Sequence, residues 1–228
     1  MSAQLLKLKE AMSKQESFTI ITYGDSWTFG SVAEGYYPEM SISESEVIYG
    51  SWAEQLKRFL QKNNPNVDFR NQGVPGWQSV QGAEAFDERV LAFKPDCIIL
   101  NFGINDWKNF AKLEQFQVMM EQMIMKSKQS GCMCLLWISG PLSISSGETY
   151  GWHSPIQDQD FPHAFSDFTE TLYQLADKHK LLVADAQRDI IDLWESGTDL
   201  SGWFYDAIHF TQKGHDRIFE SLKRTLSM

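Results

Sequence analysis

The sequence predicts an α/β protein, a three-layer αβα sandwich built on a central parallel sheet of five strands. Three observations lead to this fold. Short apolar runs recur along the chain, helical patterns separate them, and no stretch rich in Pro, Gly and Ser is long enough to act as a linker. Strands that alternate with helices are joined by right-handed crossovers, which make neighbouring strands parallel. We therefore expect one domain over residues 1–228.

The expected strands are short and largely apolar, as in a parallel sheet that is covered on both faces. They lie at residues 18–23, 67–71, 97–101, 133–138 and 181–185. The first run, Phe18-Thr19-Ile20-Ile21-Thr22-Tyr23, is both β-branched and aromatic. Such residues favour strands, so this run is expected to be buried in the sheet.

Helical patterns occupy the intervals between these strands. They cover residues 3–14, 50–62, 79–92, 110–129, 163–179 and 211–226. Thr211 stands where it can cap the last helix. Two long segments, 31–49 and 140–162, receive no element. Because loops longer than about 12 to 15 residues are commonly functional, we expect these two to form the acyl-side and alcohol-side walls of a binding pocket.

Composition excludes several classes of protein. Of the 228 residues, 43% are hydrophobic and 22% are charged, which is typical of a globular chain. The formal net charge of −10 disfavours binding to nucleic acid or to an anionic membrane. No apolar stretch approaches the ~20 residues that span a bilayer. Charged residues interrupt the first 17 positions, so no secretory signal is expected and a cytoplasmic location fits best.

Neither the cysteines nor the histidines have the spacing of a metal site. Cys132 and Cys134 alternate with apolar neighbours, and with Cys97 they make an odd count, so reduced packing residues are expected. Four histidines lack a ligand pattern, and they are His153, His163, His179 and His215. His215 is a less favoured candidate for a catalytic base because it falls inside the last expected helix. We expect no metal.

Ser26 is the first candidate for chemistry. It follows the first strand in the stretch Gly24-Asp25-Ser26-Trp27-Thr28-Phe29-Gly30. Ligands of open α/β sheets bind beyond the carboxyl ends of the strands, which is where Ser26 is expected. Two interpretations of the heptapeptide stand side by side: Ser26 is a nucleophile, or Asp25 and Ser26 cap a following helix.

Further polar residues supply what a serine nucleophile needs. A serine hydroxyl requires an imidazole as general base, and the imidazole requires a carboxylate to orient it. Asp206 and His209, three positions apart, can provide both from one turn. The developing oxyanion requires hydrogen-bond donors. Asn105, in a polar stretch after the third strand, and the turn from Gly73 to Gly76 are the available donors.

The sequence resembles the SGNH hydrolase family, the GDSL-type esterases and lipases, at four blocks that occur in the family's order. The blocks are Gly24-Asp25-Ser26, Asn71-Gln72-Gly73-Val74-Pro75-Gly76, Gly103-Ile104-Asn105-Asp106 and Asp206-Ala207-Ile208-His209. Trp27 stands where the family name has leucine. One block would be a weak signal, whereas four in order over most of the chain are specific. The chain is thus identified as a member of this family.

The resemblance implies a role for each of these residues. Ser26 would be the nucleophile, His209 the general base and then acid, and Asp206 the carboxylate that orients it. The oxyanion hole would consist of the backbone N–H groups of Ser26 and Gly76 and the side-chain amide of Asn105. The resemblance also implies a flavodoxin-like strand order. No cofactor is expected.

Tryptophans accompany every block. Trp27, Trp77, Trp107 and Trp203 lie beside the four blocks, and Trp152 lies in the second long segment. Aromatic faces bind sugar rings and acyl groups, and an indole N–H can donate to ligand oxygens. We expect these tryptophans to bind the substrate, with packing at the rim of the sandwich as the alternative.

The expected function is that of a serine esterase acting on a small-molecule or saccharide ester, with an O-acetylated saccharide favoured. An acyltransferase with the same residues is an alternative, as is a non-catalytic carbohydrate-binding module. A flavin or nucleotide binder is disfavoured, because Trp27 and Phe29 occupy the turn where a phosphate loop needs small donor residues.

Overall fold

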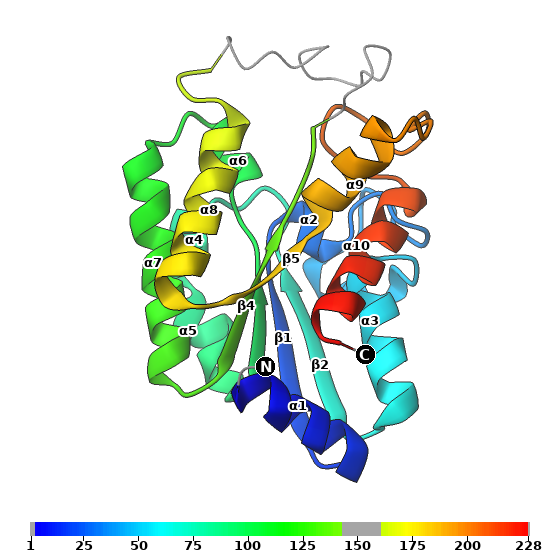
Figure 1. Ribbon diagram of the computed structural model, residues 1–228, viewed down its shortest axis with the longest axis vertical. Helices are drawn as coiled ribbons and strands as arrows, with labels where there is room; N and C mark the ends of the chain where they lie inside the picture. The colour runs from blue at the N-terminus through cyan, green and yellow to red at the C-terminus, as the bar shows by residue number, and fades with distance from the viewer. Residues whose placement is uncertain (1–2, 143–160, 228) are drawn as a thin grey trace.

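The computed structural model of the protein describes residues 3–142 and 161–227. Its five parallel strands form one sheet in the order β2-β1-β3-β4-β5 (Figure 1). The strands are β1 Phe18–Gly24, β2 Val67–Gly73, β3 Cys97–Leu100, β4 Met133–Ile138 and β5 Leu182–Asp185. This confirms the predicted αβα fold, and the order is that of flavodoxin-like sheets.

Helices cover both faces of the sheet. They are α1 Ala3–Lys14, α2 Ser26–Phe29, α3 Trp52–Asn63, α4 Ser79–Glu84, α5 Phe86–Arg89, α6 Ile104–Lys108, α7 Leu113–Gln129, α8 Phe165–His179, α9 Ala186–Glu195 and α10 Gln212–Thr225. Helix α7 packs against α4 and α8, whereas α10 packs against α3 and α9, and Figure 1 shows these two groups on opposite sides of the sheet. None of the helices in the described ranges has the length and apolar character needed to cross a membrane.

Several element boundaries differ from those expected. The single helix expected at 79–92 is divided into α4, α5 and a 3-10 turn at Leu91–Phe93. The Tyr23 hydroxyl donates to the carbonyl of Gly82, which a continuous helix would use for its next turn. The helix expected from residue 110 begins at Leu113, because Phe110 has a φ of 58°. Helix α9 was not expected, and segment 31–49 contains a 3-10 helix at Ile42–Val47.

The sheet is buried where it supports the polar blocks. Every residue of β3 and β4 is buried, as is typical of central parallel strands. The edge strand β2 is exposed at one residue and partly exposed at three others. Burial of the central strands fixes their carboxyl ends, from which the segments containing Ser26 and Asn105 emerge. The sheet therefore brings blocks that are distant in sequence to one edge.

Candidate active site

Helix α2 presents Ser26 directly after β1. Asp25 is its N-cap, and its Oδ1 accepts the backbone N–H of Trp27 at 3.0 Å. Capping therefore belongs to Asp25, which leaves the Ser26 hydroxyl available for another partner. Gly24 is required at the turn, because a Cβ there would lie 2.4 Å from the carbonyl oxygen of Asn101.

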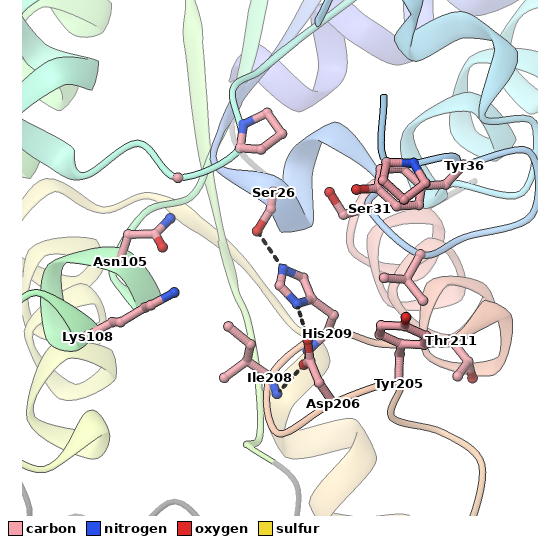
Figure 2. Close-up of a pocket in the computed structure, with 14 residues that line it drawn as sticks. Ser26, Ser31, Tyr36, Asn105, Lys108, Tyr205, Asp206, Ile208, His209 and Thr211 are labelled. Carbon is pink, nitrogen blue, oxygen red and sulfur yellow. Dashed lines mark hydrogen bonds and ion pairs between the residues drawn. The ribbon is translucent and has the colours of Figure 1, made fainter. Parts of the chain in front are cut away.

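The side chains of Ser26, His209 and Asp206 form one hydrogen-bonded chain (Figure 2). Ser26 Oγ lies 3.0 Å from His209 Nε2, and His209 Nδ1 lies 2.8 Å from Asp206 Oδ2. Because the carboxylate accepts a hydrogen bond from the Nδ1–H, a neutral imidazole has its Nε2 lone pair facing the serine hydroxyl. The structure therefore brings together the three residues that the sequence singled out.

The turn between Asp206 and His209 holds both residues in place. Asp206 Oδ1 accepts the backbone N–H groups of Ile208 at 2.8 Å and of His209 at 2.6 Å. Burial alone would raise the pKa of Asp206, but the hydrogen bonds and charge of His209, together with these N–H groups, outweigh it and lower the pKa. The carboxylate is thus held ionised beside the imidazole.

Three donors border the same cavity as the serine hydroxyl. Ser26 is the first residue of α2, so its N–H has no intrahelical acceptor. The second donor is the backbone N–H of Gly76, which lines the cavity. Gly76 has a φ of +83°, and the space beside its α-carbon is open, because no atom lies within 4 Å of where a Cβ would be. Asn105 Nδ2 donates to the carbonyl of Trp77 at 3.0 Å, and its amide nitrogen is on the side facing Ser26 in Figure 2. An amide nitrogen has two hydrogens, so the second can serve a ligand.

A buried hydrogen-bond cluster links the second and third blocks. Asp106 accepts the backbone N–H of Ser79 at 3.0 Å and its hydroxyl at 2.5 Å, which joins α6 to the start of α4. The hydrogen bonds from Ser79 lower the pKa of Asp106, but burial outweighs them and raises the pKa to about 6. Burial also raises the pKa of Asp25 to about 7. The carboxylates of Asp25 and Asp106 both accept backbone N–H groups and thereby hold backbone turns.

The cavity around Ser26 has a volume of about 720 Å³. Its lining consists of Ser26, Ser31, Val32, Tyr36, Pro38, Pro75, Gly76, Asn105, Lys108, Tyr205, Asp206, Ile208, His209 and Thr211. Residues of segment 31–49 are among them, which confirms that this segment forms part of the wall. Residues 143–160 of the second segment lie outside the described residues.

Sequence reasoning missed several lining residues. Lys108 follows Asn105 by three positions, a spacing that places both on one face only once residues 104–108 are known to form a helix, which was not expected. Tyr205 lies just before Asp206. In that stretch only Asp206 and His209 were considered as functional residues. Tyr36 and Pro38 carry no signal beyond their place in a long segment.

The tryptophans require a correction. Trp27 and Trp107 are each 1% exposed, and neither lines the cavity. Their indole N–H groups donate to the carbonyls of Ile208 and His163. The expected substrate contacts of these two residues are therefore wrong, because burial of the large indole rings in the core prevails. Trp27 instead supports the turn that carries His209.

The structure describes two of the other three tryptophans, and neither of the two lines the cavity. Trp77 and Trp203 are partly buried against the core and lie outside the cavity lining. The guanidinium of Arg89 lies over the Trp77 ring at 5.4 Å. Trp152 lies outside the described residues.

His215 is separate from the hydrogen-bonded chain of Ser26. It is buried in α10, and its Nε2 lies 3.2 Å from the carbonyl oxygen of Ser31. Cys97, Cys132 and Cys134 are buried, and none of them forms a disulfide with another described residue. In the described parts of the chain, no three His, Cys, Asp or Glu side chains are grouped so as to hold a metal ion.

Solved structures share this fold at low sequence identity. An acetylxylan esterase from Geobacillus stearothermophilus has a TM-score of 0.72 and 18% identity, with 92% of this chain and 94% of that chain covered. A two-domain esterase active on acetylated mannans has a TM-score of 0.72 and 18% identity, covering 98% of this chain and 52% of that one. An α/β hydrolase from the metagenome of Lake Arreo, Spain, has a TM-score of 0.70 and 17% identity, with 92% of this chain and 95% of that chain covered. No curated protein matches the chain by sequence.

A family model matches the chain from residue 22 to residue 217. This range starts within β1. It contains all four sequence blocks, and therefore also Ser26, His209 and Asp206. The match agrees with the strand order and with the position of the polar residues at one edge of the sheet. The chain belongs to the GDSL-like Lipase/Acylhydrolase family.

Proposed function

We propose that this protein hydrolyses carboxylic esters through an acyl-serine intermediate on Ser26, acting on an acyl group, such as acetyl, that is carried by a saccharide. The observation that carries the proposal is the hydrogen-bonded chain from Ser26 Oγ through His209 to Asp206, at the wall of a cavity bordered by three candidate oxyanion donors. These are the groups that acyl transfer to a serine requires.

In the first half of the reaction, Ser26 Oγ attacks the ester carbonyl carbon while its proton passes to His209 Nε2. Asp206 stabilises the imidazolium that forms. The carbonyl oxygen becomes an oxyanion, which accepts hydrogen bonds from the N–H groups of Ser26 and Gly76 and from the Asn105 amide. When the C–O bond to the alcohol breaks, the alcohol leaves with the proton of His209.

In the second half, a water molecule replaces the alcohol. His209 takes a proton from water as the oxygen attacks the acyl carbon, and it returns that proton to Ser26 Oγ as the acid leaves. Each proton taken by the imidazole is given back within the same half-reaction. The enzyme is thus restored without a cofactor.

The saccharide part of the proposal has two supports. The solved structures of similar fold include an acetylxylan esterase and an esterase active on acetylated mannans. The cavity also combines the rings of Tyr36 and Tyr205 with the hydroxyl-bearing residues Ser31 and Thr211. Aromatic faces with hydrogen-bonding groups beside them suit the mixed apolar and polar surface of a sugar ring.

The test is turnover of Ser26→Ala on acetylated sugars and on 4-nitrophenyl acetate. The rate should fall by about a thousandfold or more, because the three residues act as a unit. Ser13→Ala, which removes an exposed hydroxyl on α1, is the matched control and should retain the full rate. A serine-directed organophosphonate should label the wild type on Ser26 and leave Ser26→Ala unlabelled. Near-normal turnover by Ser26→Ala would contradict the proposal.

A further inference from the structure

Lys108 shares a wall of the cavity with Asn105. Both belong to helix α6 and are three positions apart, so they lie on the same face of the helix. Both line the cavity that contains Ser26 and His209. In Figure 2 the ammonium group of Lys108 extends into the space between Asn105 and His209. One short helix therefore presents an amide and a cation to the same ligand space.

Few of the described residues that line this space carry a charge. Among the described residues that line the cavity, Lys108 is the only lysine or arginine, and Asp206 is the only carboxylate. Asp206 accepts hydrogen bonds from His209 and two backbone N–H groups. In Figure 2 the uncharged ring of Tyr36 lies on the side of the cavity opposite Lys108. The neighbouring lining residues Val32 and Pro38 carry no charge either. The cavity thus has a cationic side and an uncharged side.

The surroundings of Lys108 strengthen its attraction for an anion. Burial lowers the pKa of Lys108, and the charge of Asp206 acts in the opposite direction. A partly desolvated ammonium attracts an anion more strongly than one in bulk water, because less solvent screens the pair. The whole chain has a formal net charge of −10, which repels anions at long range. A cation inside the cavity is therefore a local exception to the field of the protein.

We propose that Lys108 selects esters that carry a negative charge close to the ester group, such as a carboxylate on the acyl chain or on the alcohol portion, for example an acylated acidic saccharide. This inference rests on the proposed function, since it names the class of ester that the Ser26 site takes. The carboxylate would accept a charge-assisted hydrogen bond from Lys108 while the carbonyl oxygen occupies the donors near Asn105.

Two pairs of esters test the proposal, and each pair differs in one charge. Mono-4-nitrophenyl glutarate and its neutral terminal amide place the difference on the acyl side. 4-Acetoxybenzoate and 4-acetoxybenzamide place it on the alcohol side. The wild type should prefer the anion in one of the pairs by about ten- to a hundredfold in kcat/KM, the range of a hydrogen bond to a charged group. The pair that shows the preference identifies the side on which the charge is recognised.

Lys108→Met, which keeps an unbranched side chain but removes its charge, should abolish that preference, lowering the kcat/KM of the anionic ester by about ten- to a hundredfold more than that of its neutral partner. Lys108→Arg should keep the preference. Lys112→Met is the matched control, because Lys112 is exposed and outside the cavity lining, yet the substitution changes the net charge equally. Lys112→Met should retain the preference.

Salt dependence of the wild type gives a readout that needs no variant. If Lys108 attracts the anionic ester, its kcat/KM relative to the neutral partner should fall as NaCl is raised from about 20 mM to about 0.5 M. Without such a contact, the net negative charge of the protein would make that ratio rise with salt. The two cases therefore predict opposite signs for the change of this kcat/KM ratio with salt.

Three results would overturn the inference while the esterase proposal stands: neutral esters turned over without an anionic preference, a preference that survives in Lys108→Met, or an equal loss on both members of a pair. The last result would assign Lys108 a general part in the reaction. By contrast, if the wild type hydrolyses none of these esters and none of the acetylated sugars, the proposed function itself fails.

Discussion

Ser26 takes its position from the residues on either side of it. Asp25 caps α2, and Gly24 allows the backbone to pass close to the carbonyl of Asn101. Asn71, in the second block, donates to the carbonyls of Thr28 and Phe29 at the end of the same short helix. The serine hydroxyl therefore does not have to support the turn, and it can face His209.

Asn105 offers a direct test at the residue scale. If the Asn105 amide belongs to the proposed oxyanion hole, Asn105→Ala should lower kcat by roughly 10²–10³, because the developing oxyanion loses a donor. Asn109→Ala is a suitable control, since Asn109 only contributes a hydrogen bond to the carbonyl of Asn105 from the end of α6. Steady-state kinetics on one activated ester compare the two variants. Equal, small losses in both would remove the Asn105 amide from the proposed oxyanion hole.

At the scale of elements, the site depends on how α6 is joined to α4. The carboxylate of Asp106 in α6 accepts both the backbone N–H and the hydroxyl of Ser79 in α4. The carbonyl of Trp77, just before α4, accepts the Asn105 amide. The second and third blocks are therefore fixed to each other by buried hydrogen bonds.

Ser79→Ala tests this link between elements. It leaves the buried Asp106 with one fewer donor and should destabilise the protein by about 1–3 kcal/mol, the range for a buried polar group that loses a partner. It should also lower kcat, because α6 carries Asn105. Ser127→Ala removes a buried hydroxyl that donates to the carbonyl of Met123, far from these blocks in sequence. Denaturant unfolding and kinetics measured together should show a loss of kcat in Ser79→Ala alone.

The sequence predicted the elements unequally. Long apolar runs such as β4 were placed at their observed bounds, because a buried central strand has a continuous apolar signature. Helix α6 was not expected, and a helix capped by Asp25, as α2 is, was only one of two interpretations of its heptapeptide. Both helices are short polar blocks whose shape is set by caps and tertiary contacts. The helix expected at 79–92 is divided after Glu84, close to Gly82, whose carbonyl accepts the hydroxyl of Tyr23 in β1. Local periodicity contains no sign of such a contact.

At the scale of the whole molecule, buried titratable groups make the stability depend on pH. Burial lowers the pKa of His215 to about 4 from an ordinary value of 6.5. Below its ordinary pKa the unfolded chain binds a proton that the folded chain excludes, so stability is lost as the pH falls from about 6.5 towards 4. Asp25 and Asp106 have raised pKa values, so they act in the opposite direction as the pH rises.

His215→Gln isolates this contribution. Between about pH 7.5 and pH 5 the wild type should lose about 1–2 kcal/mol more stability than the variant, which corresponds to a Tm difference of about 2–6 °C. Both proteins keep Asp25 and Asp106, so their opposing contributions cancel in the comparison. Thermal unfolding at the two pH values measures it. Parallel pH dependence in both proteins would show that His215 is not the group responsible.

The sequence by itself determined the fold class and the family, and it singled out Ser26, Asp206 and His209 as the candidate catalytic residues. It could do so because residue types and their order are local properties of the chain. Only the tertiary structure decided which side chains share the cavity. Lys108 and Tyr36 line the cavity wall in the structure, whereas Trp27 and Trp107 are buried in the core. The reason is physical: burial of an indole depends on surfaces contributed by distant segments, and no spacing along one segment records them.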